Sequence, residues 1–233
     1  MEALGLAATC YNPAQAKLLE ANPPPTYTTT NIFEIFGRVQ ADKRMDSAFD
    51  HNHDDKLNHL WTDPALSSIL LEHWSAWKIT DAKADFQQSQ ELAVALHSSS
   101  ATSVGGHGYD FLLVHLLTTS HALRILIPFL EPQHHLPLVK EWLLVTLSIY
   151  ITQSRPLIKR EYVTEYDLHD RNWDFVTDKA LHGKHKFDAH FVKGCRAMLE
   201  AERTWGGQEE YWLKAAVKFA DEFPGRVFGD GSE

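Results

Sequence analysis

Residues 109–130 read YDFLLVHLLTTSHALRILIPFL, and this stretch decides the fold. Leucine, valine and isoleucine recur in it at the three- and four-residue spacing of an α-helix, without the alternation of a half-buried strand. Asp110 stands where an acid stabilises the first turn, and Pro128 weakens or ends the helix. A helix this apolar is expected to be largely buried, so other helices must cover it.

Start and stop signals predict further helices along the whole chain. Asn31 with Glu34 forms a capping box, and Asp63 with Pro64 forms an N-cap followed by proline at the first helical position. The other expected helices span 81–96, 137–151, 170–181, 187–205 and 208–223. The Ser- and Gly-rich residues 98–108 form the clearest interior loop. We therefore expect an all-α fold: a single helical domain over residues 1–233 with about seven to nine helices.

The composition is that of an ordinary globular protein and limits the classes of partner. The chain has 233 residues, with 22 Lys and Arg against 31 Asp and Glu, and its formal charge is −9. This acidic balance argues against nucleic acid or an anionic membrane as the main partner, because both attract basic patches. No stretch reaches the roughly 18 apolar residues of a membrane span, since His115, His121 and Arg124 interrupt the longest candidate. We expect no nucleic-acid partner and no membrane partner.

The cysteines and the N-terminus indicate a cytoplasmic protein. Only Cys10 and Cys195 occur, far apart and without a CxxC pattern, which fits a reducing compartment and excludes a disulfide scaffold. The residues before Pro13 carry no basic region and only a short apolar run, so we expect no secretory signal. Histidine, in contrast, occurs 14 times. It is the side chain that most readily moves protons or binds metals near neutral pH.

Several polar side chains interrupt the apolar helix that begins near residue 109. With Asp110 at zero and about 100° per residue, Arg124 falls near −40° and His121 near 20°. Thr118 follows near 80°, so that these side chains share one stripe, and His115 lies near 140° on a second face. Asp110 and His121 are roughly 16 Å apart along the axis, so an orienting partner of His121 must come from another helix. Helix capping and bonds to neighbouring helices are the alternative, purely structural interpretation.

A second group of basic side chains recurs at three-residue spacing: His190, Lys193 and Arg196. This face is either solvated or binds an anionic group such as a phosphate or a phenolate. An HxxH pair precedes it, but the HxxxH or HExxH spacing of catalytic zinc helices is absent from the sequence, and we predict no metal site. The sequence also contains no GxGxxG, GxxxxGK[ST] or GxSxG, and no flavin or haem motif.

Three motifs of this sequence resemble those of the questin oxidase-like family of fungal secondary metabolism. The first is HGYDF (107–111) followed by VHLLTTSHALR (114–124), the second is FEIFGRVQADKR (33–44), and the third is FDAHFVKGCRAML (187–199). They occur in the family's order. The resemblance extends from about Glu2 to about Phe219.

The resemblance implies a Baeyer–Villiger-type oxygenation of an aromatic polyketide such as an anthraquinone, with O2 as the second substrate. It implies NADPH as the reductant, without a flavin, and self-association is a further expectation. His121 would take a phenolic proton as the base, Arg124 would stabilise the oxyanion, and His115 would line the pocket. The expected substrate-binding residues are His107, Tyr109, Asp110, Thr118, His190, Lys193 and Arg196.

Members of the family are longer, and residues 2–12 of this sequence resemble one of their internal segments. In relatives, a histidine-containing Ala-His-x-x-Ile-His-x-Gly-Tyr motif precedes that segment. The resemblance therefore predicts an incomplete half of a larger helical fold, with inactivity through truncation as one hypothesis. Two alternatives stay open: a non-catalytic helical interaction protein or degenerate homologue, and a metal-dependent hydrolase built on the histidines.

Overall fold

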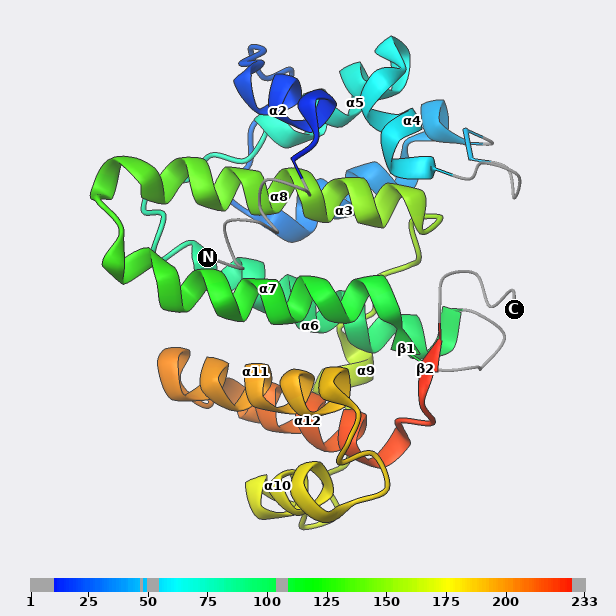
Figure 1. Ribbon diagram of the computed structural model, residues 1–233, viewed down its shortest axis with the longest axis vertical. Helices are drawn as coiled ribbons and strands as arrows, with labels where there is room; N and C mark the ends of the chain where they lie inside the picture. Colours follow the sequence, from blue (N-terminus) through cyan, green and yellow to red (C-terminus); the bar gives the residue numbers. More distant parts are fainter. Residues whose placement is uncertain (1–10, 47, 50–54, 104–108, 228–233) are drawn as a thin grey trace. The chain divides into compact units, whose positions relative to one another are not determined.

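Figure 1 shows an all-α fold, as the sequence predicts. The computed structural model describes residues 11–46, 48–49, 55–103 and 109–227. These residues form eleven α-helices, α2 to α12, together with four short 3-10 helices and two strands of two residues each. The helices outnumber the expected seven to nine because the sequence signals missed three short ones: α2 (Pro13–Glu20), α4 (Lys56–Thr62) and α9 (Glu161–Thr164). The 3-10 helices are η1 (Lys43–Met45), η2 (Ile127–Phe129), η3 (Pro132–His134) and η4 (Gln208–Glu210).

The chain divides into two compact units. Unit 1 consists of Met1–Lys78 and Lys140–Ser154, and unit 2 consists of Ile79–Val139 and Arg155–Glu233. The helix α8 (His135–Thr152) therefore contributes its first residues to unit 2 and the others to unit 1. The motif at 33–44 belongs to unit 1, whereas the motifs at 107–124 and 187–199 belong to unit 2.

The predicted caps start the two main helices of unit 1. In α3 (Ile32–Ala41) the Asn31 side chain accepts from the backbone N–H of the second helical residue at 2.9 Å, and Asp63 does the same in α5 (Pro64–Ser75). The capping box itself does not close. The Glu34 carboxylate instead accepts from the hydroxyl of Thr29 at 2.7 Å.

Aromatic side chains and one lysine fix the α8 residues of unit 1. The ring of Phe36, on α3, lies 5.0 Å from that of Tyr150, and both are fully buried. Lys140 donates to the backbone carbonyls of Trp74 and Trp77 at 3.0 Å, while the Trp74 indole donates to the Lys140 carbonyl at 2.7 Å. Burial lowers the pKa of the Lys140 amine to about 8. A half-buried lysine thus bonds backbone carbonyls at the end of α5.

Unit 2 contains two pairs of packed helices. α6 (Phe86–Ser103) packs along α7 (Phe111–Leu126), and α11 (Ala189–Trp205) packs along α12 (Tyr211–Glu222), with α10 (Trp173–His182) against the second pair (Figure 1). α7 also packs against α11, and this contact joins the two pairs. The apolar helix predicted at 109–130 is therefore covered by helices on two sides.

A short parallel strand pair precedes α7. β1 (Tyr109–Asp110) pairs with β2 (Arg226–Val227). The ring of Tyr109, in β1, packs against the rings of His97 and Phe219. All three rings are buried, and each pair of ring centroids is at most 4.9 Å apart. The C-terminal part of unit 2 thus returns to the start of the apolar helix.

The boundaries of α6 correct the sequence prediction at both ends. The helix begins at Phe86, because the Asp85 carboxylate accepts from the backbone of Thr80 and Asp81 and holds those residues in a turn. It continues to Ser103, through residues predicted as loop. The serines are buried and bonded: Ser100 donates to the His97 carbonyl at 2.6 Å and accepts from the backbone of β1. Residues 104–108 of the predicted loop lie outside the described residues.

One described segment, Phe111–Phe129, is long and apolar enough to cross a membrane by length and composition, and a third of it is buried. The core helix of a soluble protein meets the same criterion, so this is weak evidence. The absence of a membrane partner stays a prediction.

Candidate functional site

The contact between α7 and α11 brings together residues that the sequence offered as two separate clusters. At one end, the His190 ring lies 4.8 Å from the rings of both Phe111 and His115. At the other end, Arg124 donates to the hydroxyl of Thr204 at 2.6 Å. The two helices therefore run in the same direction (Figure 1). We call this line of side chains the α7–α11 seam: Phe111, His115, His121 and Arg124 of α7, with His190 and Thr204 of α11.

His115 is held in a defined tautomer. Its Nδ1 lies 2.7 Å from the backbone carbonyl oxygen of Phe111, one turn earlier in α7. Because a carbonyl oxygen only accepts, Nδ1 carries the proton, and the neutral ring presents an unprotonated Nε2. The side chain is half-buried. His115 therefore has the geometry of a base.

His121 is held in the opposite tautomer. Its Nδ1 lies 3.3 Å from the guanidinium of Arg124. Since a guanidinium only donates, Nδ1 accepts, and the neutral ring carries its proton on Nε2. Burial lowers the pKa of His121, and the positive charges of Arg124 and Arg196 lower it further. His121 is thus a neutral donor through Nε2.

The partner of His121 was predicted to come from another helix, and this prediction is wrong. Arg124 lies on the same helix, three residues on, where the two side chains meet on one face. The other helix contributes indirectly, because Thr204 of α11 holds the guanidinium. The Arg124 Nε atom is buried and has no hydrogen-bond partner among the described residues. Such a buried donor is costly unless a bound group accepts from it.

The other residues predicted around α7 have structural partners. Asp110 is the N-cap of α7, where its carboxylate accepts from the Leu113 N–H at 2.9 Å, and burial raises its pKa. Tyr109 is buried beside His97. Thr118 donates to the His115 carbonyl at 3.2 Å. His107 lies outside the described residues.

The α11 residues divide between two sides of the helix. Asp188 caps α11 through the backbone of His190, and the His190 ring faces α7 in the seam. Lys193 and Arg196 are exposed. Of these two, Arg196 acts on the seam, through its charge on His121.

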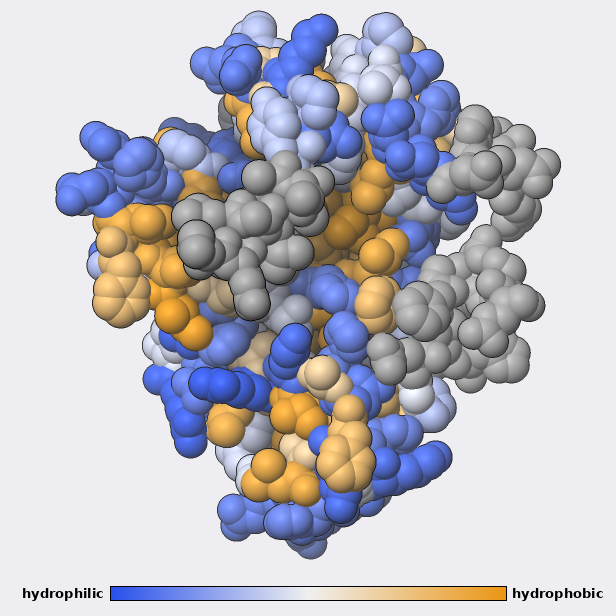
Figure 2. All heavy atoms as spheres, in the orientation of Figure 1, coloured by the Kyte–Doolittle hydropathy of each residue, from blue (hydrophilic) through white to orange (hydrophobic). Residues whose placement is uncertain are grey.

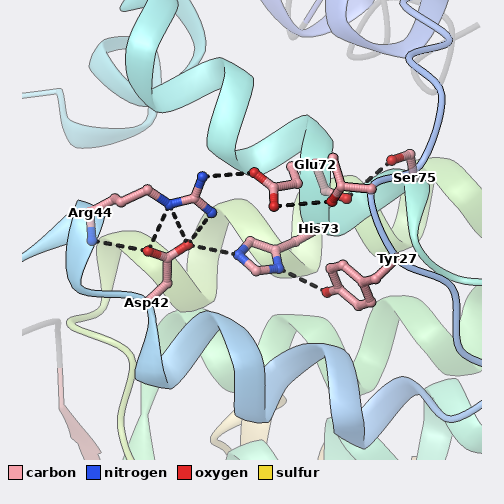
Figure 3. A network of polar contacts seen from close by, with 7 residues as sticks. Tyr27, Asp42, Arg44, Glu72, His73 and Ser75 are labelled. Carbon is pink, nitrogen blue, oxygen red and sulfur yellow. Dashed lines mark hydrogen bonds and ion pairs between the residues drawn. The ribbon is translucent and has the colours of Figure 1, made fainter.

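A polar network in unit 1 was not predicted as a site. Figure 3 shows it: His73 bonds Tyr27 through Nδ1 at 2.8 Å and Asp42 through Nε2 at 3.0 Å, and Arg44 bridges Asp42 and Glu72. The Arg44 guanidinium holds the pKa of Asp42 well below its usual range, while burial raises the pKa of Tyr27 to about 12.

This network stabilises unit 1 and is not suited to proton transfer. A phenol with a pKa near 12 keeps its proton at neutral pH, and Arg44 already neutralises the carboxylate that would support an imidazolium. The signal in the sequence was the spacing of Asp42 and Arg44 within the motif at 33–44. It gave no indication of His73, which lies 31 residues after Asp42.

The described residues contain no group of three or more His, Cys, Asp or Glu side chains that could hold a metal ion. A metal-dependent hydrolase has no supporting site in this part of the chain.

The fold and the seam define a class: an all-α protein whose histidine and arginine side chains suit proton transfer and the binding of an anionic oxygen. The sequence profile of the questin oxidase-like family matches residues 1–198 of the chain, which include two of the three motifs and most of the third. The chain belongs to the questin oxidase-like family, an oxidase family, and the resemblance seen in the sequence is confirmed. No curated protein matches the chain.

Proposed function

We propose that this protein is a flavin-free oxygenase that carries out a Baeyer–Villiger-type oxidation of a hydroxylated aromatic polyketide, such as an anthraquinone. Family membership supports an oxidase, and the α7–α11 seam supports this chemistry. A phenolate reacts with O2 more readily than the phenol does, so an enzyme without a flavin needs a base and a stabiliser for the oxyanion. The observation that carries the proposal is that the α7–α11 seam holds two histidines in opposite tautomers. His115 can accept a proton at Nε2, whereas His121 can donate from Nε2.

The tautomers suggest an exchange of the roles expected from the sequence. His115 accepts the phenolic proton at Nε2, and His190 and Phe111 flank it. His121 and Arg124 donate to the oxyanion through Nε2 and Nε. His121 is the poorer base because a second positive charge would face two arginines.

The overall reaction inserts one atom of O2 next to the ketone and reduces the other atom to water, which consumes two electrons. NADPH is the reductant in this proposal, as the family resemblance implies. The described residues, however, contain no strand, Gly-rich turn and helix of the kind that binds a dinucleotide. We therefore derive no step through NADPH. A cytoplasmic location and self-association stay predictions.

The experiment measures O2 consumption by the purified chain with a hydroxyanthraquinone, with and without NADPH. We expect His115→Gln to lower kcat by about 10²–10⁴, because the variant has no base at this position. His121→Ala should lower kcat by about 10²–10³, and His121→Gln should restore part of it, because the amide still donates. His134→Ala, at an exposed position, is the matched control.

Two outcomes would contradict the proposal in different ways. If His121→Ala and His121→Gln are both as inactive as His115→Gln, donation by His121 does not explain its role, and His121 is the base. If the folded chain binds the anthraquinone but consumes no O2 with or without NADPH, this chain is not an oxygenase, and the non-catalytic alternative gains support.

A further inference from the structure

A small cavity of about 190 Å³ opens between α10 and α11, in unit 2. Its walls are apolar: Trp173, Val176 and Ala180 on α10, and Val192, Cys195 and Leu199 on α11. Figure 2 shows hydrophobic side chains at the surface over these two helices. Arg196 is the one charged side chain among the described residues that line the cavity.

The lining of the cavity includes short side chains from both helices. On α10, Trp173, Val176 and Ala180 follow one another at helical spacing on one face, and Ala180 leaves the space that a leucine would fill. On α11, the Cys195 side chain is similarly short. This cavity is open to solvent on one side, and its apolar walls lack the dispersion contacts that a bound apolar group would restore.

The walls of the cavity carry no negative charge. Burial raises the pKa of the Cys195 thiol to about 12, so the thiol stays neutral. The Trp173 indole donates to the carboxylate of Glu202 at 2.8 Å, which fixes the ring edge and directs that carboxylate toward the indole nitrogen. Arg196 is exposed and belongs to the lining, and the described lining residues include no carboxylate.

Arg196 also connects the cavity with the α7–α11 seam. It lies four residues after Val192, which lines the cavity, and four residues before Glu200, whose charge acts on both His121 and Arg124. Its own charge acts on His121.

We propose that the cavity between α10 and α11 binds one aromatic ring of an anionic ligand, with the ligand's oxyanion paired to Arg196. An engineered apolar cavity of about 150 Å³ holds benzene, so about 190 Å³ accommodates one ring and leaves the remainder of a fused system outside. The identity of this ligand as the substrate rests on the proposed function; the binding site itself does not.

The experiment is a calorimetric titration of the full chain with 2-naphthoate, a compact aromatic anion. Its neutral amide, 2-naphthamide, and the aliphatic anion decanoate serve as comparison ligands. We expect 2-naphthoate to bind more tightly than either. Arg196→Gln should weaken 2-naphthoate binding about tenfold and leave 2-naphthamide unchanged. Lys186→Gln, which removes an exposed charge outside the cavity, should change neither affinity.

A second variant tests the cavity itself. Ala180→Leu should fill the space and abolish binding of both aromatic ligands. Because a core variant can fail to fold, the same point is tested in the wild-type chain by hydrogen exchange, where bound 2-naphthoate should raise amide protection in α10 and α11. Undiminished 2-naphthoate binding in Arg196→Gln, tighter binding of decanoate, or unchanged amide protection in α10 and α11 would each overturn the proposal.

The binding site and the proposed function fail in distinguishable ways. If 2-naphthoate binds as expected but no anthraquinone is oxidised, the cavity stands and the proposed function fails. If an anthraquinone is oxidised with the same KM by the wild-type chain and by folded Ala180→Leu, the proposed function stands and the cavity is not the substrate site.

Discussion

His97 on α6 is a buried ionisable group whose ring nitrogens have no hydrogen-bond partner among the described residues. It is 1% exposed, and the rings of Tyr109 and Phe219 enclose it at 4.8 and 4.7 Å. Burial lowers its pKa from 6.5 to about 3, because nothing compensates the lost hydration of the cation.

This burial predicts acid sensitivity in the first pH units below neutrality. Between pH 6.5 and 3 the unfolded chain protonates His97 and the folded chain does not, so the stability that His97 contributes is lost as the pH falls. From pH 7 to 5 this amounts to about 2 kcal/mol. Urea unfolding at the two pH values measures it.

The variant His97→Phe should lose about 2 kcal/mol less free energy of unfolding between pH 7 and 5 than the wild-type chain. His97→Leu serves the same purpose if phenylalanine overpacks the site. His134→Phe, at an exposed position, is the matched control and should keep the wild-type slope. Equal slopes for the wild-type chain and both His97 variants would show that His97 reaches a partner or water in solution.

At the scale of elements, two glycines inside helices make opposite predictions. A Cβ added at Gly194 of α11 would lie 2.9 Å from the Phe219 ring of α12, which other aromatic rings hold in place. A Cβ at the exposed Gly37 of α3 would meet nothing within 4 Å. Gly194→Ala should therefore lower the free energy of unfolding by about 1–3 kcal/mol. Gly37→Ala should raise it by about 0.5–1 kcal/mol through helix propensity alone.

Thermal or urea unfolding of the two variants checks whether the free energy of unfolding falls in Gly194→Ala and rises in Gly37→Ala. A gain in stability from Gly194→Ala would mean that α11 and α12 can separate enough to admit a methyl group. Such a result would contradict the close packing of α11 on α12.

The sequence was informative about elements and much less so about their pairing. The helices α3, α5, α7, α8, α10, α11 and α12 follow from caps, prolines and apolar spacing, which are local signals. The serines near the end of α6 led to a wrong prediction of a loop. Their hydroxyls accept hydrogen bonds from the backbone of β1 and of Lys159, and the helix continues through them. That choice depends on residues distant in the chain.

The arrangement of the candidate site was likewise not predictable from local sequence signals. His115 and His190 were each named from the sequence, but 75 residues separate them, and helical spacing cannot place two helices side by side. The tautomers of His115 and His121 depend on a carbonyl and a guanidinium at hydrogen-bond distance, which no pattern of residue types reveals. The cavity between α10 and α11 likewise depends on which short side chains line it.

At the scale of the whole molecule, each of the two compact units has internal ties of its own. In unit 1 these are the Phe36 and Tyr150 rings and the network around Asp42. In unit 2 the aromatic rings beside Gly194 hold α11 and α12 together. Proteins open locally in cooperative units, so a substitution inside one unit should lower the protection of that unit first.

Hydrogen exchange of the folded chain therefore tests whether the units open separately. Asp42→Ala leaves the Nε2 atom of the buried His73 without its partner, which costs about 1–3 kcal/mol. The variant should lower amide protection in α3 and α5 but not in α11 and α12. Gly194→Ala should lower amide protection in α11 and α12 but not in α3 and α5. Glu34→Gln, which removes the exposed ion pair with Arg38 and keeps an oxygen that can accept from Thr29, should change neither pattern. If both damaging substitutions lower protection equally throughout the chain, the two units form one cooperative structure, because a local loss then reaches amides that share no contact with it.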